Sequence, residues 1–490
     1  MNPAFPLSRY LILAAFLAAA ALAQFTTATL GGFVLDTSGA SIPEATLTIR
    51  HTGTDFRQTT KSDSAGAFLF PTLPVGTYEL RVEKEGFSSY TQSGIQLTVN
   101  QVANQTVTLR VGQTTEQITV DANPEMVVTK TATNGQLIDE KRVVDLPLNG
   151  RGAQALVFLA AGTVNLTGRY CGVDCHGGVY PGEQVAGVNG AGSAQVNYQL
   201  DATDHNDSYI NMNLPFPNPD SVQEFNLQSS NFTAEYGNAG GGVVNVVTKS
   251  GTNEIHGSAF EFLRNDKLNA RNFFAPTQDT LKRNQYGVSI GGPVIKSKLF
   301  YFGTFQATPI RSAPAGRVSF VPTAAERTGD FSGLLAGASP VVIRDPSTGQ
   351  PFPGNIIPAN RITAPSKYFI DRVPLPNGAG RQLTFGGAQQ VSDDYQFMPK
   401  ADWYISERQH LSGRYFWTDY NRPAVADAVN VLRSTGGNQV RIQNLSLIHI
   451  PAWLYDIWDD TGPGKDCEAN RPTGLARAHC PRHYKAWCTH

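Results

Sequence analysis

The sequence predicts a mainly β protein, and three observations lead to this prediction. Glycine and proline make 77 of 490 residues while charged residues make only 16%, a composition typical of ordered, turn-rich chains. Short alternating apolar and polar runs, separated by turn signals, fill residues 29–111, and longer ones fill residues 255–421. Such runs are typical of strands. After residue 23 no stretch approaches 18 continuous apolar residues, so any membrane insertion there must use strands.

Charge and cysteine content exclude two classes of protein. Lys and Arg number 39 against 40 Asp and Glu, so no basic surplus is available for a phosphate backbone, and no nucleic-acid partner is expected. Five cysteines in 490 residues are too few for a disulfide scaffold.

The first 23 residues predict a secretory signal peptide. Arg9 supplies the positive charge, an apolar run follows from Leu11 to Leu22, and Ala21-Leu22-Ala23 forms a small-x-small cleavage site. The alternative is a membrane anchor, but about a dozen residues at 1.5 Å each cannot cross ~30 Å of hydrocarbon. The mature chain is expected to begin near Gln24.

Residues 26–111 predict a small antiparallel sandwich, because short strands alternate with Gly-containing turns. We expect the alternating apolar side chains to form its core: Val34, Ile42, Leu47, Ile49, Phe68, Leu73, Tyr78, Leu80, Val82 and Phe87.

Residues 112–130 read as an extended linker without a hairpin partner, and residues 131–253 as a mixed domain. The latter holds a short predicted helix followed by the turn LPLNGR, then a Gly/Asn-rich stretch, then a strand-turn-strand unit. Its Gly240, Gly241 and Gly242 would let backbones approach closely.

Residues 254–444 predict longer strands, at 258–264, 286–291, 299–306 and 411–420. In the last of these, Leu411, Tyr415 and Trp417 alternate with Arg414 and Phe416 among polar residues. Aromatic alternation of this kind suits a membrane β-barrel, although a soluble β-sandwich has the same period.

Three segments carry a family resemblance: LPLNGR (146–151), VNGAGSAQVNYQLDATDHND (188–207) and SVQEFNLQSSNFTAEYGNAGGGVVNVVTKSGTNEIHG (221–257). With them, the chain resembles an Oar-like TonB-dependent outer-membrane transporter over about residues 26–444. The resemblance implies a carboxypeptidase regulatory-like domain at 26–111, which is a transthyretin- or Ig-like sandwich of the carbohydrate-binding-like fold. It further implies an α+β plug domain at 131–253 and the first strands of an antiparallel outer-membrane β-barrel at 254–444.

The resemblance assigns the plug motif to twelve positions: Leu146, Pro147, Asn149, Gly150, Arg151, Asn189, Gly190, Asp201, Tyr236, Gly237, Gly241 and Gly242. One position departs from the family pattern. Ala202 stands where the family usually has the glycine of an LDG turn, which puts the backbone conformation of that turn in doubt.

Within the linker, seven residues resemble a Ton box, the segment that TonB grasps by strand addition: Glu116, Gln117, Ile118, Thr119, Val120, Asp121 and Ala122. The alternative is that this segment is the last strand of the sandwich. Its place between sandwich and plug favours the Ton box.

The resemblance implies energy-coupled uptake without covalent chemistry or a cofactor. Its partners would be TonB, with ExbB and ExbD acting through it, outer-membrane lipid and an unidentified extracellular ligand. The implied location is the outer membrane of a Gram-negative bacterium, with the sandwich in the periplasm. A different class remains open, a surface adhesion or scaffold protein whose sandwich binds glycan or protein, and so does a secreted multidomain binder.

Enzymatic and metal-binding functions are not favoured by the residues. The sequence has no GxSxG, HExxH or P-loop, and Lys249-Ser250-Gly251 lacks the partners of a penicillin-binding triplet. Four residues at 201–207 could contact a hard cation, namely Asp201, Asp204, Asn206 and Asp207, but their spacing lacks the EF-hand pattern. A solvated or hydrogen-bonded loop is therefore favoured.

Cys171 and Cys175 are separated by three residues, and an oxidising periplasm favours a disulfide between them. Free thiols are the main alternative. A metal site that includes His176 is disfavoured, because this short cluster supplies at most three ligands.

The barrel is expected to be incomplete. A 22-stranded family barrel at roughly 10 residues per strand needs about 220 residues before loops, and residues 255–444 supply 190. Residues 445–490 hold three of the five cysteines, lack alternation and begin with Leu445-Ser446-Leu447-Ile448-His449-Ile450, which resembles a translated sequencing adapter. We expect a non-native or out-of-frame tail. The alternative is a zinc-binding tail using Cys467, His479, Cys480, His483 and Cys488, which lacks paired CxxC spacing.

Overall fold

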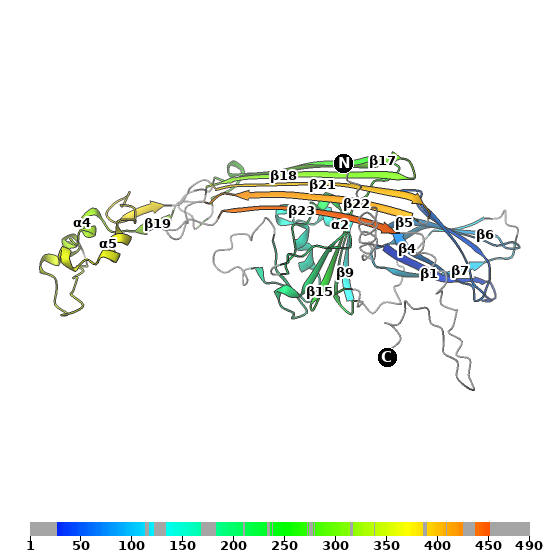
Figure 1. Ribbon diagram of the computed structural model, residues 1–490, viewed down its shortest axis with the longest axis horizontal. Helices are drawn as coiled ribbons and strands as arrows, with labels where there is room; N and C mark the ends of the chain where they lie inside the picture. The colour runs from blue at the N-terminus through cyan, green and yellow to red at the C-terminus, as the bar shows by residue number, and fades with distance from the viewer. Residues whose placement is uncertain are drawn as a thin grey trace, which may run out of the picture.

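The structure is a computed structural model, and Figure 1 shows a long sheet with a smaller mixed sheet beneath it and a sandwich at one end. It describes residues 27–112, 117–121, 134–167, 183–208, 211–232, 236–237, 239–271, 273, 278, 280–313, 317–337, 339–385, 390–407, 409–424 and 437–450. The predicted mainly β fold class is confirmed.

The sandwich consists of two facing sheets. The smaller sheet has the order β4-β1-β7, with β1 Thr27–Asp36, β4 Ala67–Pro74 and β7 Val102–Leu109. The larger has the order β3-β2-β5-β6-β8, with β2 Thr46–His51, β3 Arg57–Lys61, β5 Gly76–Glu83, β6 Ser89–Leu97 and β8 Gln117–Asp121. The expected core residues are buried between the sheets, and Phe87 packs partly buried against them. Alternation along the strands places these side chains on the inner faces.

The segment predicted to be a plug forms a five-stranded mixed sheet of order β13-β12-β15-β14-β9, and we call this body the plug after that prediction. Its strands are β9 Asn134–Asp139, β12 Val196–Leu200, β13 Thr203–Asp204, β14 Val222–Ser230 and β15 Gly242–Thr248. The central strand β15 is buried along its whole length. Helix α2 (Glu140–Asp145) follows β9 and begins where the Asp139 side chain accepts a hydrogen bond from the Arg142 amide, an N-cap.

Shorter elements complete the plug around this sheet. They are the 3₁₀ turns η1 Asn149–Arg151, η2 Ala153–Leu159, η4 Ser193–Gln195 and η5 Pro219–Ser221, and the strand pair β10 Thr163–Asn165 and β11 Ala186–Val188.

Six long antiparallel strands form the wall sheet, our name for β16-β17-β18-β21-β22-β23 in this order. Their bounds are β16 His256–Asn265, β17 Lys282–Ile295, β18 Leu299–Ser312, β21 Gln390–Ser406, β22 Gln409–Arg422 and β23 Asn438–Ile450; the turn η6 (Asp266–Leu268) follows β16. The four strands expected from alternation are confirmed. Among the described strands the sheet does not close, since β16 and β23 stand at its two edges.

The last strand differs from the expected boundary at residue 444. β23 continues to Ile450, which pairs with His410 of β22, so the strand includes the first six residues of the expected tail. Residues 451–490 lie outside the described residues, and the expectation of a non-native tail stays a prediction.

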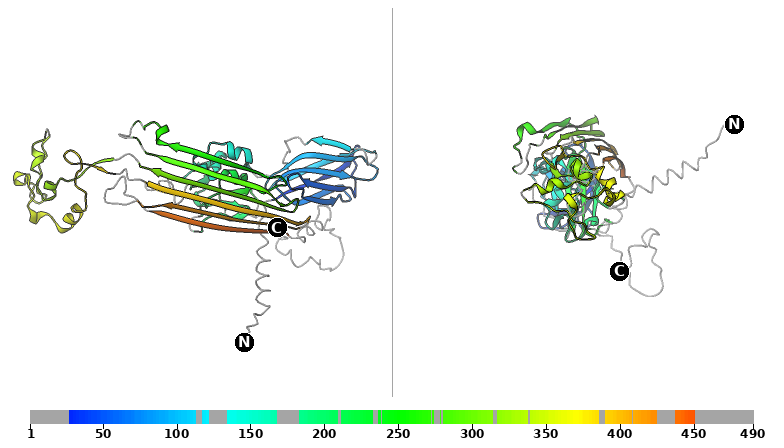
Figure 2. Two further views of the ribbon diagram at one scale, coloured as in Figure 1. Left: turned by 90° about the horizontal axis from the view of Figure 1, so that it is seen from above. Right: turned by 90° about the vertical axis from the view of Figure 1, so that its left-hand side faces the viewer.

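An insert between β18 and β21 lies at the end of the wall sheet away from the sandwich (Figure 2). It contains β19 Arg317–Phe320, α4 Ala324–Arg327, η7 Ser332–Leu335, η8 Pro353–Asn355, η9 Ala359–Arg361, α5 Ala364–Ile370 and β20 Gln382–Phe385. A capping box between Thr323 and Glu326 starts α4. None of the helices in the described part of the chain combines the length and apolar content that crossing a bilayer requires.

Candidate functional site

The predicted Ton box lies at the edge of the sandwich. Residues 117–121 form β8, which pairs in parallel with β6 from Ser89↔Gln117 to Ser93↔Asp121. Glu116 and Ala122 lie outside the described residues. The structure thus has the segment as a sandwich strand, the alternative that the sequence left open, while its recognition by TonB stays a prediction.

The plug continues the chain from this segment through β9. β9 is the edge strand of the plug sheet and pairs antiparallel with β14, from Glu224↔Asp139 to Ser230↔Asn134. Only residues 122–133 separate β8 from β9. Within the plug, tension passed along the chain from residues 117–121 would therefore reach the edge strand β9 first.

The LPLNGR turn joins the plug to the wall sheet. Gly150 and Arg151 both have positive φ, 81° and 55°, and the Arg151 guanidinium forms an ion pair with Asp220. The same guanidinium lies 4.3 Å from the ring centroid of Phe260 and 4.7 Å from that of Phe262 on β16. Leu146 and Leu148 pack against the plug core. The turn thus holds an arginine between a plug carboxylate and two aromatic rings.

The remaining glycine motifs permit close backbone contacts in the plug. Asn189 and Gly190 have φ of 50° and 80°, and Asn189 Nδ2 donates to the Ser229 carbonyl at 2.6 Å. A Cβ added to Gly241 would lie 2.8 Å from Ala191 Cβ, which confirms the predicted close approach at the triple glycine. Nearby, Tyr236 is buried and the Gly237 carbonyl accepts a hydrogen bond from Asn197.

A buried carboxylate, Asp201, connects the plug to the wall sheet. Its Oδ2 lies 3.1 Å from Arg414 Nε on β22, and its Oδ1 lies 3.8 Å from Lys400 Nζ on β21. The Thr248 amide and hydroxyl of β15 donate to the two oxygens at 2.8 and 2.7 Å. We call Asp201, Thr248, Lys400 and Arg414 the plug–wall cluster.

The cations of this cluster are fixed by further plug groups. Lys400 Nζ donates to the carbonyl and the hydroxyl of Thr248, both at 3.1 Å, and Arg414 donates to the Leu200 carbonyl at 3.2 Å. Since buried charges are tolerated only when paired and hydrogen-bonded, this cluster defines how the plug sits on the wall sheet.

The turn at Asp201 and Ala202 keeps a left-handed backbone despite the missing glycine. Asp201 has φ 47° and Ala202 has φ 58°, a region that favours glycine. The departure from the family pattern therefore leaves the turn in place at the cost of strain at Ala202. The nearby Asn206 makes hydrogen bonds to the Tyr198 amide and the Val196 carbonyl, as expected for a hydrogen-bonded loop.

His205 is fully buried beside the cluster. Its Nε2 lies 2.8 Å from the Pro215 carbonyl oxygen, and its ring packs against Phe216 in a tilted arrangement with the ring centroids 4.7 Å apart. Burial, reinforced by the positive charge of Arg414, lowers the pKa of His205 to about 3. The imidazole is therefore neutral and serves as a packing group.

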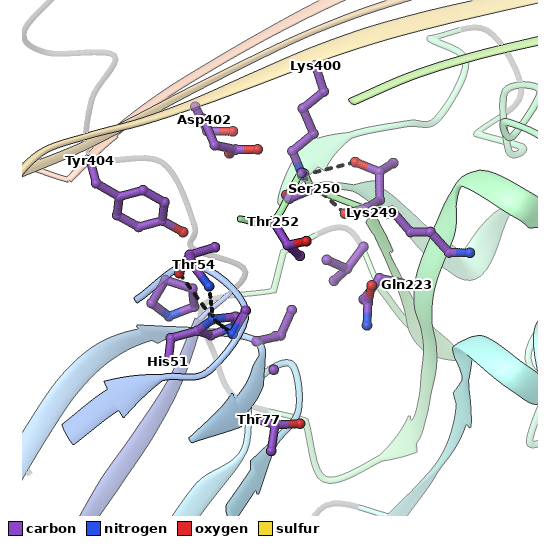
Figure 3. Close-up of a pocket in the computed structure, with 18 of the residues that line it drawn as sticks. His51, Thr54, Thr77, Gln223, Lys249, Ser250, Thr252, Lys400, Asp402 and Tyr404 are labelled. Carbon is purple, nitrogen blue, oxygen red and sulfur yellow. Dashed lines mark hydrogen bonds between the residues drawn. The ribbon is translucent and has the colours of Figure 1, made fainter. Parts of the chain in front are cut away.

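Three bodies surround a cavity of about 450 Å³ (Figure 3). The sandwich contributes residues 51–54, the plug residues 247–251, and the wall sheet Lys400, Asp402 and His410. In the sandwich wall, His51 Nδ1 accepts from the amides of Gly53 and Thr54 at 3.2 and 3.1 Å, and burial lowers the pKa of His51 to about 4. The cavity lies where sandwich, plug and strands meet.

The sandwich docks on both neighbours. The Val99 amide donates to Glu224 Oε2 at 2.8 Å, and the Asn253 amide donates to the Gly53 carbonyl at 2.8 Å. Phe56 packs against Tyr404 of β21 with ring centroids 5.2 Å apart. Burial raises the pKa of Glu224 to about 7, so this docking contact includes a group that titrates near neutrality.

Several functional contacts were not predicted from the sequence. Arg414, Lys400, Glu224 and Val99 carry the plug and sandwich contacts. Glu224 lies in the segment 221–257 but was assigned no role, and the other three belong to no motif. A signal was present for Arg414, which occupies the same alternating face as Phe416 and Thr418. Cys171 and Cys175 lie outside the described residues, and their disulfide stays a prediction.

Comparisons with known proteins match two segments of the chain. A carboxypeptidase regulatory-like domain matches residues 29–110 and an outer membrane beta barrel domain matches residues 247–451. The TonB-dependent transporter Oar of Myxococcus xanthus is 29% identical over 304 residues, which cover 58% of this chain and 27% of Oar. A probable TonB-dependent siderophore receptor, PirA of Acinetobacter baumannii, is 32% identical over 124 residues, covering 24% of this chain and 15% of PirA.

Solved structures of outer-membrane proteins overlap with the chain. The siderophore receptor PirA from Acinetobacter baumannii has a TM-score of 0.34 at 13% identity, over 63% of this chain and 34% of PirA. The outer membrane transporter YddB from Escherichia coli has a TM-score of 0.36 at 12% identity, over 64% of this chain and 36% of YddB. The sequence matches confirm the predicted resemblance to Oar-like TonB-dependent transporters, and the curated relatives are a transporter and a receptor rather than enzymes. The matches span about a quarter or less of those relatives' lengths.

Proposed function

From this confirmed resemblance, we propose that the chain acts in a TonB-dependent outer-membrane receptor that takes up an external ligand without covalent chemistry. Residues 116–122 serve as the Ton box, and TonB, energised through ExbB and ExbD, pulls on them from the periplasm. The sandwich faces the periplasm and the β19–β20 insert faces the outside. This orientation is supported by the positions of the two bodies at opposite ends of the wall sheet.

One observation carries the proposal: the segment 117–121 is joined by residues 122–133 to β9, the edge strand of the plug sheet. β9 holds the plug through its antiparallel pairing with β14. An edge strand can be peeled away one pair at a time, whereas a central strand such as β15 has partners on both sides. A pull from TonB would therefore loosen β9 before it disturbs the rest of the plug.

The plug–wall cluster opposes displacement of the whole plug by this pull. Asp201 lies on the plug, and its cationic partners Arg414 and Lys400 lie on the wall sheet. Separation of the plug from the sheet would therefore leave these charges without their partners. Removal of one partner from a buried pair of this kind costs about 3–5 kcal/mol, which shows how strongly a buried charge depends on its partner. We infer that uptake proceeds by rearrangement near β9 and β14 while the cluster keeps the plug seated.

Binding of the periplasmic domain of TonB to the purified chain tests the proposal. Val120→Pro removes an amide donor that strand addition needs, and we expect at least a tenfold loss of affinity. Val120→Ile keeps the donor and the β-branched side chain, and is expected to bind as the parent chain does. Parent-like binding by both Val120→Pro and a deletion of residues 116–122 would refute the assignment.

A further inference from the structure

We propose that the sandwich keeps the Ton box covered: β6 holds β8, and TonB must displace β6 to bind the same strand. This inference rests on the proposed function, since it assumes that residues 116–122 are the segment that TonB binds. It adds a role for the sandwich, which would act as a gate that controls access of TonB to the Ton box.

The pairing of β8 is the first step of the argument. Five consecutive residues of β8 pair in parallel with five of β6, in continuous register from Ser89↔Gln117 to Ser93↔Asp121. β6 has β5 on its other side, so β8 occupies the one edge of β6 that β5 leaves open. Strand addition by TonB at the edge of β8 that β6 occupies would use the same main-chain donors and acceptors of β8, so it requires β6 to leave.

The second step is that β8 is an addition to a domain that is already formed. The carboxypeptidase regulatory-like match ends at residue 110, and the sandwich core is built by residues between Ala28 and Leu109, together with Phe300 and Tyr404 of the wall sheet. The contacts Val99–Glu224 and Gly53–Asn253 dock the sandwich through other residues. β8 can therefore leave while the sandwich stays folded and docked.

The third step concerns the path of force. A β8 still paired with β6 would pass tension into the sandwich, which is anchored to the plug through Glu224 and to the wall sheet through Tyr404. Tension reaches β9 only after β8 has left β6. Addition of TonB to the outer edge of β8 would leave the pairing of β8 with β6 intact, whereas addition at the edge that β6 occupies would break it. The two modes of binding therefore differ in whether β8 stays paired with β6.

A reversible disulfide distinguishes these modes. Thr91→Cys with Thr119→Cys joins two directly paired residues of β6 and β8, in a chain whose five native cysteines are replaced by serine. Thr48→Cys with Thr59→Cys is the matched control, because these paired residues have hydroxyl oxygens 3.4 Å apart on β2 and β3 and leave β8 untouched. Binding of the purified periplasmic domain of TonB is measured for each chain in oxidised and reduced form.

We expect oxidation of the Thr91/Thr119 pair to reduce TonB affinity at least tenfold and reduction to restore it, while the control pair binds equally in both forms. Equal binding by the oxidised and reduced Thr91/Thr119 pair would overturn the gate but leave the Ton box intact. Absence of binding by the reduced forms and by the parent would overturn both proposals.

Hydrogen exchange provides a second readout that needs no cysteine. On addition of the TonB domain to the parent chain, amides of residues 89–93 should exchange at least tenfold faster, because β6 loses its partner while β8 gains one. Unchanged or slower exchange at 89–93 in the bound state would overturn the gate.

Discussion

Arg414 Nε lies 3.1 Å from Asp201 Oδ2, and both side chains are almost completely buried between the plug and the wall sheet. The two residues are 213 positions apart in the chain, so this contact exists only when plug and strands are assembled. Lys400 Nζ lies 3.8 Å from the other carboxylate oxygen, Asp201 Oδ1. One carboxylate on the plug therefore faces two cations from neighbouring strands.

Substitution of Arg414 by alanine should weaken plug seating strongly. It leaves Asp201 with Lys400 as a more distant cation and removes the hydrogen bond to the Leu200 carbonyl. Removal of one partner of a buried pair costs about 3–5 kcal/mol. Urea-induced exposure of the plug, followed by limited proteolysis, measures this loss. Arg441→Ala, which breaks the exposed pair with Asp419, is the control and should cost at most about 1 kcal/mol.

Substitution of Ala202 by glycine should stabilise the plug. Ala202 has φ 58°, and the left-handed region costs a residue with a Cβ roughly 1–2 kcal/mol. The greater freedom of glycine in the unfolded chain offsets about half of this gain, which leaves up to about 1 kcal/mol. Ala160→Gly is the matched control, since Ala160 is also buried but has φ −81°. A stabilising effect of both substitutions in denaturant unfolding would contradict the explanation from backbone strain.

Docking of the sandwich on the plug should weaken as pH rises from 4.5 to above 7. Burial raises the pKa of Glu224 to about 7 from 4.5; the hydrogen bond from the Val99 amide opposes this rise, and the Asp139 charge adds to it. The docked form therefore binds the proton more tightly than the undocked form, so its stabilisation is complete below pH 4.5 and is lost as pH passes 7. The change amounts to about 3 kcal/mol over this interval.

Hydrogen exchange of residues 98–101, corrected for the intrinsic pH dependence of amides, measures this docking. Glu224→Gln keeps an acceptor for the Val99 amide and should remove the pH dependence between 4.5 and 7. Glu254→Gln, on an exposed loop, should leave it unchanged. A pH dependence that survives in Glu224→Gln would show that Glu224 is not the group responsible.

Local patterns in the sequence account for much of the fold. The period-two runs at 286–291 and 411–420 predict strands that the structure contains as β17 and β22, because alternation is dictated by the two faces of a single strand. The glycine-rich stretch at 240–242 predicts a close backbone approach that Gly241 and Ala191 confirm. These features depend on residues that are neighbours in the sequence, so each can be predicted from a single segment of the chain.

Contacts between the bodies could not be predicted in this way. Glu224 and Val99 are 125 positions apart. Glu224 does not stand out in β14, and Val99 contributes its main-chain amide from the turn between β6 and β7. The pairing of β8 with β6 was one of two open interpretations of residues 116–122, since an extended segment satisfies both. Pairing between residues far apart in the sequence depends on how complete domains dock, and the local alternation of apolar and polar residues does not predict it.

Substitution of Gly76 by alanine should destabilise the sandwich more than a comparable glycine substitution elsewhere. Gly76 has φ 143°, and a Cβ at this position would overlap Nε2 of the half-buried His51 ring. Gly39 also has positive φ, 86°, but a Cβ there meets nothing within 4 Å. Gly39→Ala should therefore cost only backbone strain, about 1 kcal/mol, while Gly76→Ala adds overpacking of about 1–3 kcal/mol.

The overlap with His51 gives this prediction a sharper test by double-mutant cycle. His51→Ala alone removes the acceptor for the Gly53 and Thr54 amides and should itself destabilise the sandwich. In that background the ring is gone, so Gly76→Ala should lose its packing penalty and cost about as much as Gly39→Ala. The two residues are in contact, and a coupling energy of about 1–3 kcal/mol in thermal unfolding is expected. Additive effects would mean that the backbone at Gly76, and not the His51 ring, determines the cost.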